Sequence, residues 1–165
     1  MALSARRLLW HYSVPLLLLV APVVVTTEVF KYYVTHTYTG KIGIGKLMFG
    51  YLSIAPAIGL YHIQKRRLWF KEINCVVDMK TFDKCVEETA LKLKWKIEEK
   101  ASVYVVAKSG FSWNSWGELI TIIKDDNRIL FNSICDSDNM ISIASWGMNK
   151  KNRETFQESL EKNCA

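Results

Sequence analysis

The stretch LLWHYSVPLLLLVAPVVVTTEVF occupies residues 8–30, and a second apolar stretch, LMFGYLSIAPAIGLYHI, occupies residues 47–63. Each is close to the ~20 residues that a helix needs to cross a hydrocarbon core of roughly 30 Å. Two such stretches joined by a short loop predict a transmembrane hairpin. We expect the hairpin to occupy residues 1–72 and a separate domain to occupy residues 73–165.

The first apolar stretch has an alternative interpretation. Arg6 and Arg7 followed by a leucine run are also typical of a cleaved signal peptide. However, the apolar run continues through Pro22 to Phe30, which is longer than a usual signal core, and no small-x-small cleavage site precedes Lys31. We therefore expect a retained anchor.

The charge of the chain is unevenly distributed. The net charge is +6, but residues 1–73 carry +7 and residues 74–165 carry −1. The basicity therefore belongs to the membrane half, where cations set topology and contact anionic lipid. This distribution favours anionic lipids as partners and argues against nucleic acid.

Basic residues also predict the orientation of the hairpin. Lys and Arg in short flanks favour the cytoplasmic side. The connecting loop carries three lysines, whereas the two outer flanks together carry more cations. The predicted membrane-surface residues after the second stretch are Lys65, Arg66, Arg67 and Lys71. We expect a multi-pass protein of the inner (plasma) membrane with both termini in the cytoplasm.

The second apolar stretch contains a pair of small residues, Ala55 and Gly59, at a spacing of four. Such a pair permits close approach of two helices. One hypothesis is that the two spans pack on each other. The other is that this pair docks against a larger membrane protein, and the sequence leaves both open.

The remainder of the chain alternates between short apolar segments and turns. The pattern predicts strands at 73–77, 95–99, 102–108, 116–124 and 128–134, a helix at 78–93 and a final helix from Asn149 to about 162. Asp78 is expected to cap the first helix, and Phe156 and Leu160 are expected to face inward from the last. The predicted fold is α+β: a transmembrane hairpin followed by a small antiparallel sheet with two helices on one face.

Four short segments carry a resemblance. They are FSW at 111–113, SWGE at 115–118, NSI at 132–134 and SWGMNKKN at 145–152. They resemble a cytosolic domain carried by small membrane-anchored bacterial proteins without an established activity. The order of elements is also similar to that of a TATA-binding-protein half-domain. Neither resemblance implies catalytic residues.

The inventory of side chains argues against an enzyme. No histidine follows residue 62, which removes the usual partner of a serine or cysteine nucleophile. The four cysteines form no CxxC pair, so we expect neither a metal site nor a cofactor. An enzyme would have to depend on carboxylates such as Glu118, Asp136 or Asp138.

Two groups of residues remain as candidate binding sites. Lys150, Lys151 and Arg153 begin the final helix, where free N–H groups can bind an anion, although the sequence favours a solvated basic turn neutralised by Glu154 and Glu158.

Trp113 and Trp116 flank a polar turn and suit either a partner interface or the end of a small core. An interface suits Trp113 better, and burial suits Trp116 better. The sequence thus predicts a non-catalytic accessory or regulatory subunit that docks on a larger membrane protein through its hairpin and its domain. The alternative is a membrane-tethered sensor or effector that binds an anionic ligand or lipid headgroup.

Overall fold

The computed structural model describes residues 4–37, 40–110, 117–136 and 147–164. The chain forms two compact units, Met1–Lys65 and Arg66–Ala165, which we name the helical unit and the sheet unit. Residues 66–72, which the sequence placed with the hairpin, belong to the sheet unit.

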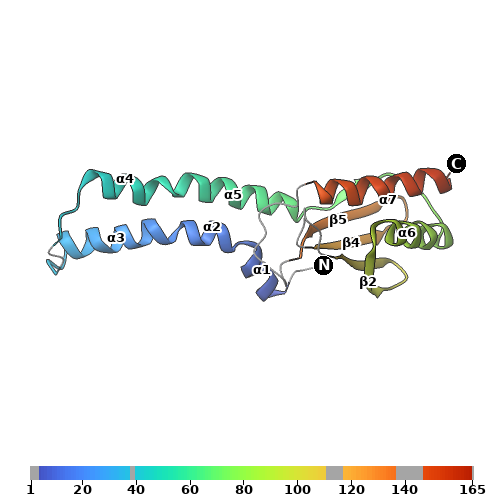
Figure 1. Ribbon diagram of the computed structural model, residues 1–165, viewed down its shortest axis with the longest axis horizontal. Coiled ribbons are helices and arrows are strands. Elements are labelled where there is room, and N and C mark those ends of the chain that lie inside the picture. Colours follow the sequence, from blue (N-terminus) through green and yellow to red (C-terminus); the bar gives the residue numbers. More distant parts are fainter. Residues whose placement is uncertain (1–3, 38–39, 111–116, 137–146, 165) are drawn as a thin grey trace. The chain divides into compact units, whose positions relative to one another are not determined.

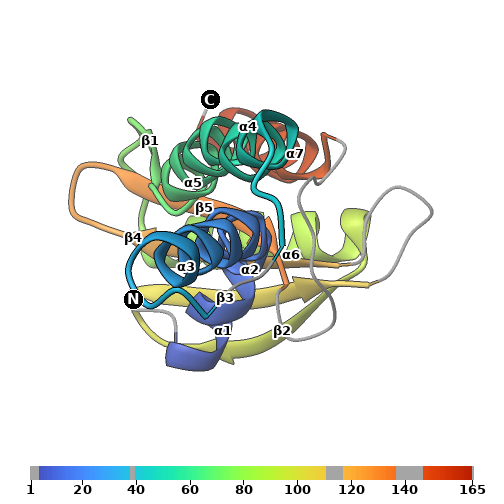
Figure 2. The same ribbon diagram turned by 90° about the vertical axis from the view of Figure 1, so that its left-hand side faces the viewer.

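The helical unit contains two long runs of helix. Its described segments are α1 (Ala5–His11), α2 (Ser13–Leu18), α3 (Val20–Tyr33), α4 (Ile44–Leu52) and α5 (Ile54–Arg67). The runs Ser13–Tyr33 and Ile44–Arg67 are long and apolar enough to cross a membrane. They lie side by side and antiparallel (Figure 1 and Figure 2). Both runs thus overlap the predicted spans, and the first starts later because α1 is a separate helix.

Prolines explain why the helices are interrupted. The interruptions fall at Tyr12, Leu19 and Ser53, and Pro15, Pro22 and Pro56 follow each of them by three residues. Proline has no N–H, and its ring clashes with the carbonyl group four residues earlier. That carbonyl belongs to the last residue of the preceding helix in all three cases. Near two of the interruptions a serine hydroxyl donates to a backbone carbonyl, which restores part of the lost hydrogen bonding.

The two long runs contact each other most closely at a glycine. A Cβ atom added to Gly50 would lie 2.4 Å from a methyl carbon of Val25, so only glycine permits this approach. The hydroxyl groups of Thr26 and Tyr51 are 3.1 Å apart, and the neighbouring Glu28 forms an ion pair with Lys46. Packing, a hydrogen bond and an ion pair therefore hold α3 against α4 over about one turn of each helix.

The sheet unit contains five strands and two helices among its described residues. They are β1 (Lys71–Ile73), α6 (Met79–Leu93), β2 (Trp95–Lys100), β3 (Tyr104–Ser109), β4 (Glu118–Lys124), β5 (Ile129–Cys135) and α7 (Met148–Cys164). The strands form one antiparallel sheet in the order β1-β5-β4-β3-β2. Helices α6 and α7 lie side by side on one of its faces (Figure 1). The predicted α+β class is confirmed.

The boundaries follow the prediction with one clear exception. β1 was expected at 73–77 but lies at Lys71–Ile73, where Glu72 pairs with Leu130 at the edge of the sheet. Val76, an apolar residue that suggested a strand, is 72% exposed. The predicted cap is confirmed, because the Asp78 carboxylate accepts a hydrogen bond of 2.9 Å from the backbone N–H of Thr81.

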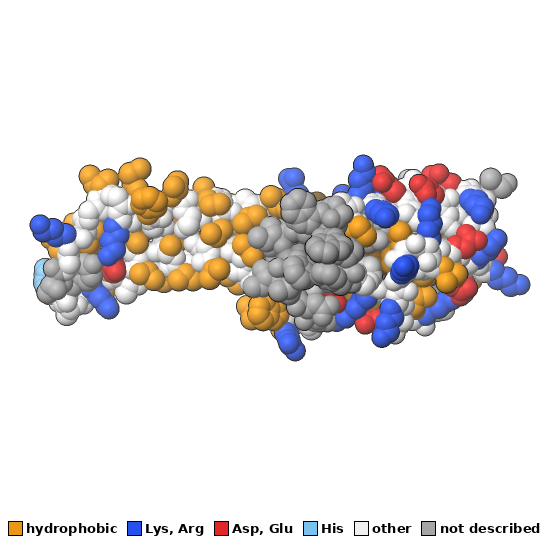
Figure 3. Space-filling model, viewed as in Figure 1, with side chains coloured by type: hydrophobic (Ala, Val, Ile, Leu, Met, Phe, Trp, Pro, Cys, Tyr) orange, Lys and Arg blue, Asp and Glu red, His pale blue; other side chains and the backbone are white. Residues whose placement is uncertain are grey.

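The core of the sheet unit lies between the helices and the inner face of the sheet. Phe156 and Leu160 are fully buried, as predicted. The rings of Phe131 and Phe156 stack with centroids 5.7 Å apart, and Phe82 meets Phe156 edge-on at 6.4 Å. Charged side chains gather over the surface of this unit, whereas the side of the hairpin seen in Figure 3 is mainly apolar between its ends.

Candidate functional site

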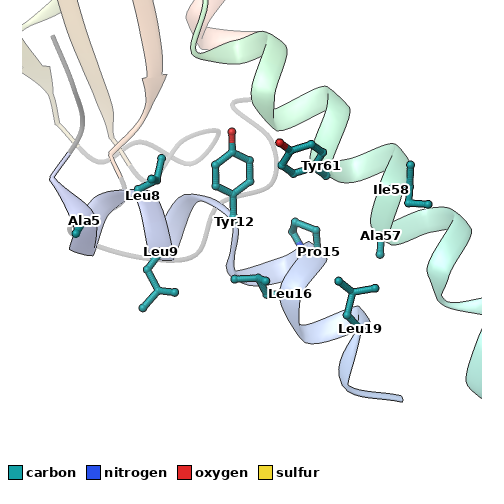
Figure 4. Close-up of a pocket in the computed structure, with 10 residues that line it drawn as sticks. All are labelled: Ala5, Leu8, Leu9, Tyr12, Pro15, Leu16, Leu19, Ala57, Ile58 and Tyr61. Carbon is teal, nitrogen blue, oxygen red and sulfur yellow. The ribbon is translucent and has the colours of Figure 1, made fainter. Parts of the chain in front are cut away.

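The helical unit has an apolar pocket between α1, α2 and α5. Its volume is about 480 Å³, and ten residues line it (Figure 4). The pocket exists because the chain breaks at Tyr12, so that α1 turns away from the line of α2. The lining includes Leu8 and Leu9 from α1, Leu16 from α2, and Ile58 from α5. Such a pocket can hold an apolar group and has no means to bind a charged one inside.

One end of this pocket is polar. The rings of Tyr12 and Tyr61 lie 5.3 Å apart, and their hydroxyl groups point toward the same end (Figure 4). Beside them, the Nε2 atom of His11 lies 3.1 Å from the carbonyl oxygen of Gln64, which joins the end of α1 to α5. The pocket is therefore apolar inside, with two phenol groups at its rim.

Two cations lie close in sequence to residues that line the pocket. Arg6 directly follows Ala5, a lining residue, and Lys65 lies one helical turn after Tyr61 on the same side of α5. Neither forms an ion pair within the part of the chain that the structure describes. Neither cation lines the pocket.

The predicted membrane-surface residues continue past α5. Lys65, Arg66 and Lys71 are exposed, and Arg67 is partly buried. Trp69 lies among them and is 63% exposed. Cations beside an exposed indole are typical of a segment at the membrane–water boundary.

The segment after α5 is fixed to the sheet. The side-chain amide of Asn132 donates to the carbonyl oxygens of Arg67 and Trp69, each at 3.0 Å. Asn132 lies on β5 and is largely buried. The basic segment is therefore held against the sheet rather than left as a free linker.

The predicted partner-binding pair, Ala55 and Gly59, lies on the exposed side of α5. A Cβ atom added to Gly59 would meet nothing within 4 Å. The contact between the two long runs uses Gly50 instead, and Ala57 is the buried small residue of α5. Ala55 and Gly59 are thus available to another helix.

A row of polar side chains crosses the inner face of the sheet at one end. Trp95 pairs with Ser109, and Glu118 pairs with Cys135. The Ser109 hydroxyl accepts a hydrogen bond of 2.8 Å from the backbone N–H of Glu118, which joins the two pairs into one row. The side chain of Glu118 is completely buried. Its carboxylate shares this face with Ile120, two residues along β4, because strand side chains alternate.

Asn152 extends this row into α7. Its amide accepts a hydrogen bond of 3.3 Å from the indole N–H of Trp95 and donates to the hydroxyl of Ser133 at 3.0 Å. That hydroxyl in turn donates to Asn149 at 3.0 Å. The first turns of α7 therefore face the polar row.

The two buried acidic residues do not form a catalytic pair. Asp136 follows Cys135 and so lies on the opposite face of the sheet from Glu118. Its carboxylate instead meets the ammonium of Lys108 at 3.1 Å, and Glu98 lies 3.4 Å from the same ammonium. Partial burial lowers the pKa of Lys108, but its bonds to Asp136 and Glu98 outweigh this and raise that pKa above its ordinary value. This arrangement is typical of a structural ion pair.

The predicted anion-binding cations lie on more than one side of α7, with Lys150 and Arg153 one helical turn apart. Lys150 is exposed and lies 3.6 Å from Glu154. Lys151 is exposed, and Arg153, two residues later, leaves the helix about 160° away from it. The alternative function that relies on these residues stays a prediction.

Some predicted residues cannot be placed. Trp113, Trp116 and Asp138 lie outside the described residues. Within the described ranges no group of three His, Cys, Asp or Glu residues could hold a metal ion. The buried thiol of Cys85 donates to the backbone carbonyl oxygen of Ser159 at 3.4 Å. No family model, curated protein or solved structure matches this chain.

Sequence reasoning missed the pocket and the polar row. The signal for the pocket was Pro15, because each proline of the hairpin interrupts its helix three residues earlier. The signal for the polar row was a polar residue at one end of each of two strands whose other residues are mainly apolar: Ser109 ends β3 and Glu118 begins β4.

Proposed function

We propose that this chain is a non-catalytic accessory or regulatory subunit of a membrane protein complex. It docks on a larger integral membrane protein through the hairpin, and its sheet unit acts on that partner beside the membrane. Both termini are cytoplasmic and the membrane is the inner (plasma) membrane. Anionic lipids contact the basic segment.

The observation that carries this proposal is the attachment of Asn132 to the carbonyl groups of Arg67 and Trp69. Only residues 68–70 separate α5 from β1, a length of at most about 10 Å. Two hydrogen bonds from the sheet further restrain this short connection. A short connection tethers the sheet unit to the end of α5, which suits a subunit that acts on its partner beside the membrane.

The exposed side of α5 supplies a surface for docking. Between membrane helices, small residues permit close packing, which replaces the missing hydrophobic driving force. Ala55 and Gly59 lie on this side, whereas the hairpin's own contact uses Gly50. The hairpin therefore remains intact while it binds a second protein.

The test is purification of the full chain in mild detergent from its native membrane, with identification of the proteins that accompany it. Gly59→Leu fills the exposed side of α5 and is expected to remove the partner. Gly45→Leu is the matched control, because a Cβ atom there also meets nothing within 4 Å and Gly45 lies outside the small-residue pair. A chain that always purifies alone, or a partner that both variants retain, contradicts the proposal.

The orientation has its own test. A reporter fused after Ala165 is expected to be active only in the cytoplasm, because the basic residues flank the ends of the two runs. Activity of the reporter only in the periplasm contradicts the proposed topology.

A further inference from the structure

We propose that two copies of this chain associate through strand β2, which pairs antiparallel with its own copy about Ile97 and continues the sheet from one sheet unit into the other. β2 lies at one edge of the sheet, and among the described residues only β3 pairs with it. The opposite edge is β1, a strand of three residues, whereas β2 has six. β2 is therefore the longer edge at which another strand can add. This inference concerns the sheet unit and needs neither a membrane nor a larger protein partner.

The order of charges along β2 makes this strand complementary to itself. Lys96, Ile97 and Glu98 follow one another in the sequence. In an antiparallel pair centred on Ile97, Lys96 of each copy lies opposite Glu98 of the other copy. Opposite charges directly across a strand pair are favourable, and like charges are destabilising. A register centred on Lys96 or on Glu98 would place like charges opposite each other, so the charge order selects Ile97 as the centre.

The charge of Lys96 has no ion-pair partner in the part of the chain that the structure describes. Lys96 lies opposite Lys108 of β3, which is an unfavourable pair of like charges. The ammonium of Lys108 contacts the carboxylates of Glu98 and Asp136. Because Glu98 reaches Lys108, its side chain lies on the same face of the sheet as Lys96. A second copy therefore brings a carboxylate directly across from Lys96 on that face.

A groove beside β2 extends the proposed interface to α6. Its volume is about 720 Å³, and it lies between Ala90 and Leu91 of α6 and Ile97 of β2. Leu91 is 82% exposed, although α6 is one of the two helices that cover the sheet. The two-fold axis of the pair passes through Ile97, at right angles to the sheet, so both α6 helices lie on the same face. The two grooves then join, and each Leu91 becomes covered by the other copy.

A β-bulge limits the length of the new strand pair. The register of β2 against β3 shifts between Ile97 and Glu99, so Glu98 is an extra residue on β2. A bulge increases the local twist and shortens the edge that can pair. A two-fold contact also uses the same edge of both copies, so no β2 edge remains for a third chain. We therefore expect a reversible dimer rather than a filament.

The experiment is an exchange of charges, followed by native mass spectrometry of the full chain released from mild detergent. We expect the unmodified chain to form a dimer at micromolar concentration. Lys96→Glu and Glu98→Lys should each raise the dissociation constant of the dimer about tenfold, because each turns both cross-strand pairs into pairs of like charge. An equimolar mixture of the two variants, one of them labelled with nitrogen-15, should regain the dimer as a mixed pair. Lys80→Glu, an exposed position on α6, is the matched control and should leave the dissociation constant unchanged.

A second pair of variants tests the groove. Leu91→Asp should abolish the dimer and leave the thermal midpoint of the monomer unchanged, because Leu91 is exposed in a single copy. Val76→Asp is the matched control, since Val76 is also exposed and follows the opposite edge strand. If Glu98→Lys fails to fold through loss of its contact with Lys108, Lys96→Glu and Leu91→Asp still decide the question. A monomer for the unmodified chain, a dimer that either of these two variants retains, or no mixed pair from two folded charge variants overturns the inference.

Discussion

Replacement of Gly50 by alanine should weaken the contact between the two long helical runs. The added Cβ atom would lie 2.4 Å from a methyl carbon of Val25 and 3.0 Å from its Cβ atom. Carbon atoms in good contact are about 3.5–4.0 Å apart, so the helices must separate by roughly 1 Å or one side chain must leave its rotamer. Overpacking of this kind costs about 1–3 kcal/mol.

The same displacement affects the neighbouring polar contacts. One residue further along each helix, the hydroxyl groups of Thr26 and Tyr51 are 3.1 Å apart. A shift of roughly 1 Å lengthens that separation beyond a normal hydrogen bond. The expected loss for Gly50→Ala therefore lies toward the upper end of the range.

The measurement is titration of the full chain with sodium dodecyl sulfate, followed by energy transfer between dyes on the two runs. Gly50→Ala should separate the dyes at a lower detergent fraction than the unmodified chain does. Gly45→Ala, on the same helix but with nothing within 4 Å, should not. Val25→Ala removes the methyl groups that the new Cβ atom meets, so the double variant should recover most of the loss. Equal midpoints for the two glycine variants, or no recovery in the double variant, would refute the reasoning.

Three further predictions concern the sheet unit. Asn152→Ala leaves the buried indole N–H of Trp95 without its acceptor and should lower the free energy of unfolding, measured with denaturant, by about 1–3 kcal/mol. Lys151→Ala, on the exposed side of α7, should change that free energy by less than about 0.5 kcal/mol. The pKa of Glu88 lies below its ordinary value because two side chains of α7 donate to its carboxylate. The contribution of the Glu88 carboxylate to folding stability is therefore complete above the ordinary carboxyl pKa and is lost as the pH falls through the lowered pKa. Glu88→Gln should reduce the thermal midpoint at neutral pH and should match the unmodified chain in acid. A constant difference in thermal midpoint at all pH values would count against this. Asn132→Ala removes two hydrogen bonds to the segment after α5 and should speed tryptic cleavage at residues 65–67 about 5–30-fold, with an unchanged rate as the opposing result.

Most of the fold follows from local patterns in the sequence. Asp78 caps α6 because its carboxylate reaches a free N–H of the first turn, and that signal is visible in the sequence. Phe156 and Leu160 are a helical turn apart and are both buried. Such elements depend on a few neighbouring residues, so the sequence is sufficient to predict them.

The candidate sites depend on contacts that the sequence does not display. The polar row requires the register that places Glu118 opposite Cys135, and register is a property of two strands. β1 was misplaced for the same reason, since Glu72 finds its partner on β5 far along the chain. The pocket requires α1 to leave the line of α2, and the hydrogen bond from His11 to the carbonyl oxygen of Gln64 that restrains it joins residues 53 apart.

The three proline interruptions differ in effect because different contacts surround them. Near Leu19 and Ser53 the two long runs press together through Gly50 and Val25, so the helix resumes in nearly the same direction after each interruption. At Tyr12 the described contacts include the ring contact with Tyr61 and the hydrogen bond from His11 to the carbonyl oxygen of Gln64, and α1 turns away from the line of α2. The same covalent cause therefore gives a continuous run in two places and a pocket in the third. Tight packing across the hairpin at Gly50 and Val25 therefore distinguishes the two interruptions beside it from the one at Tyr12.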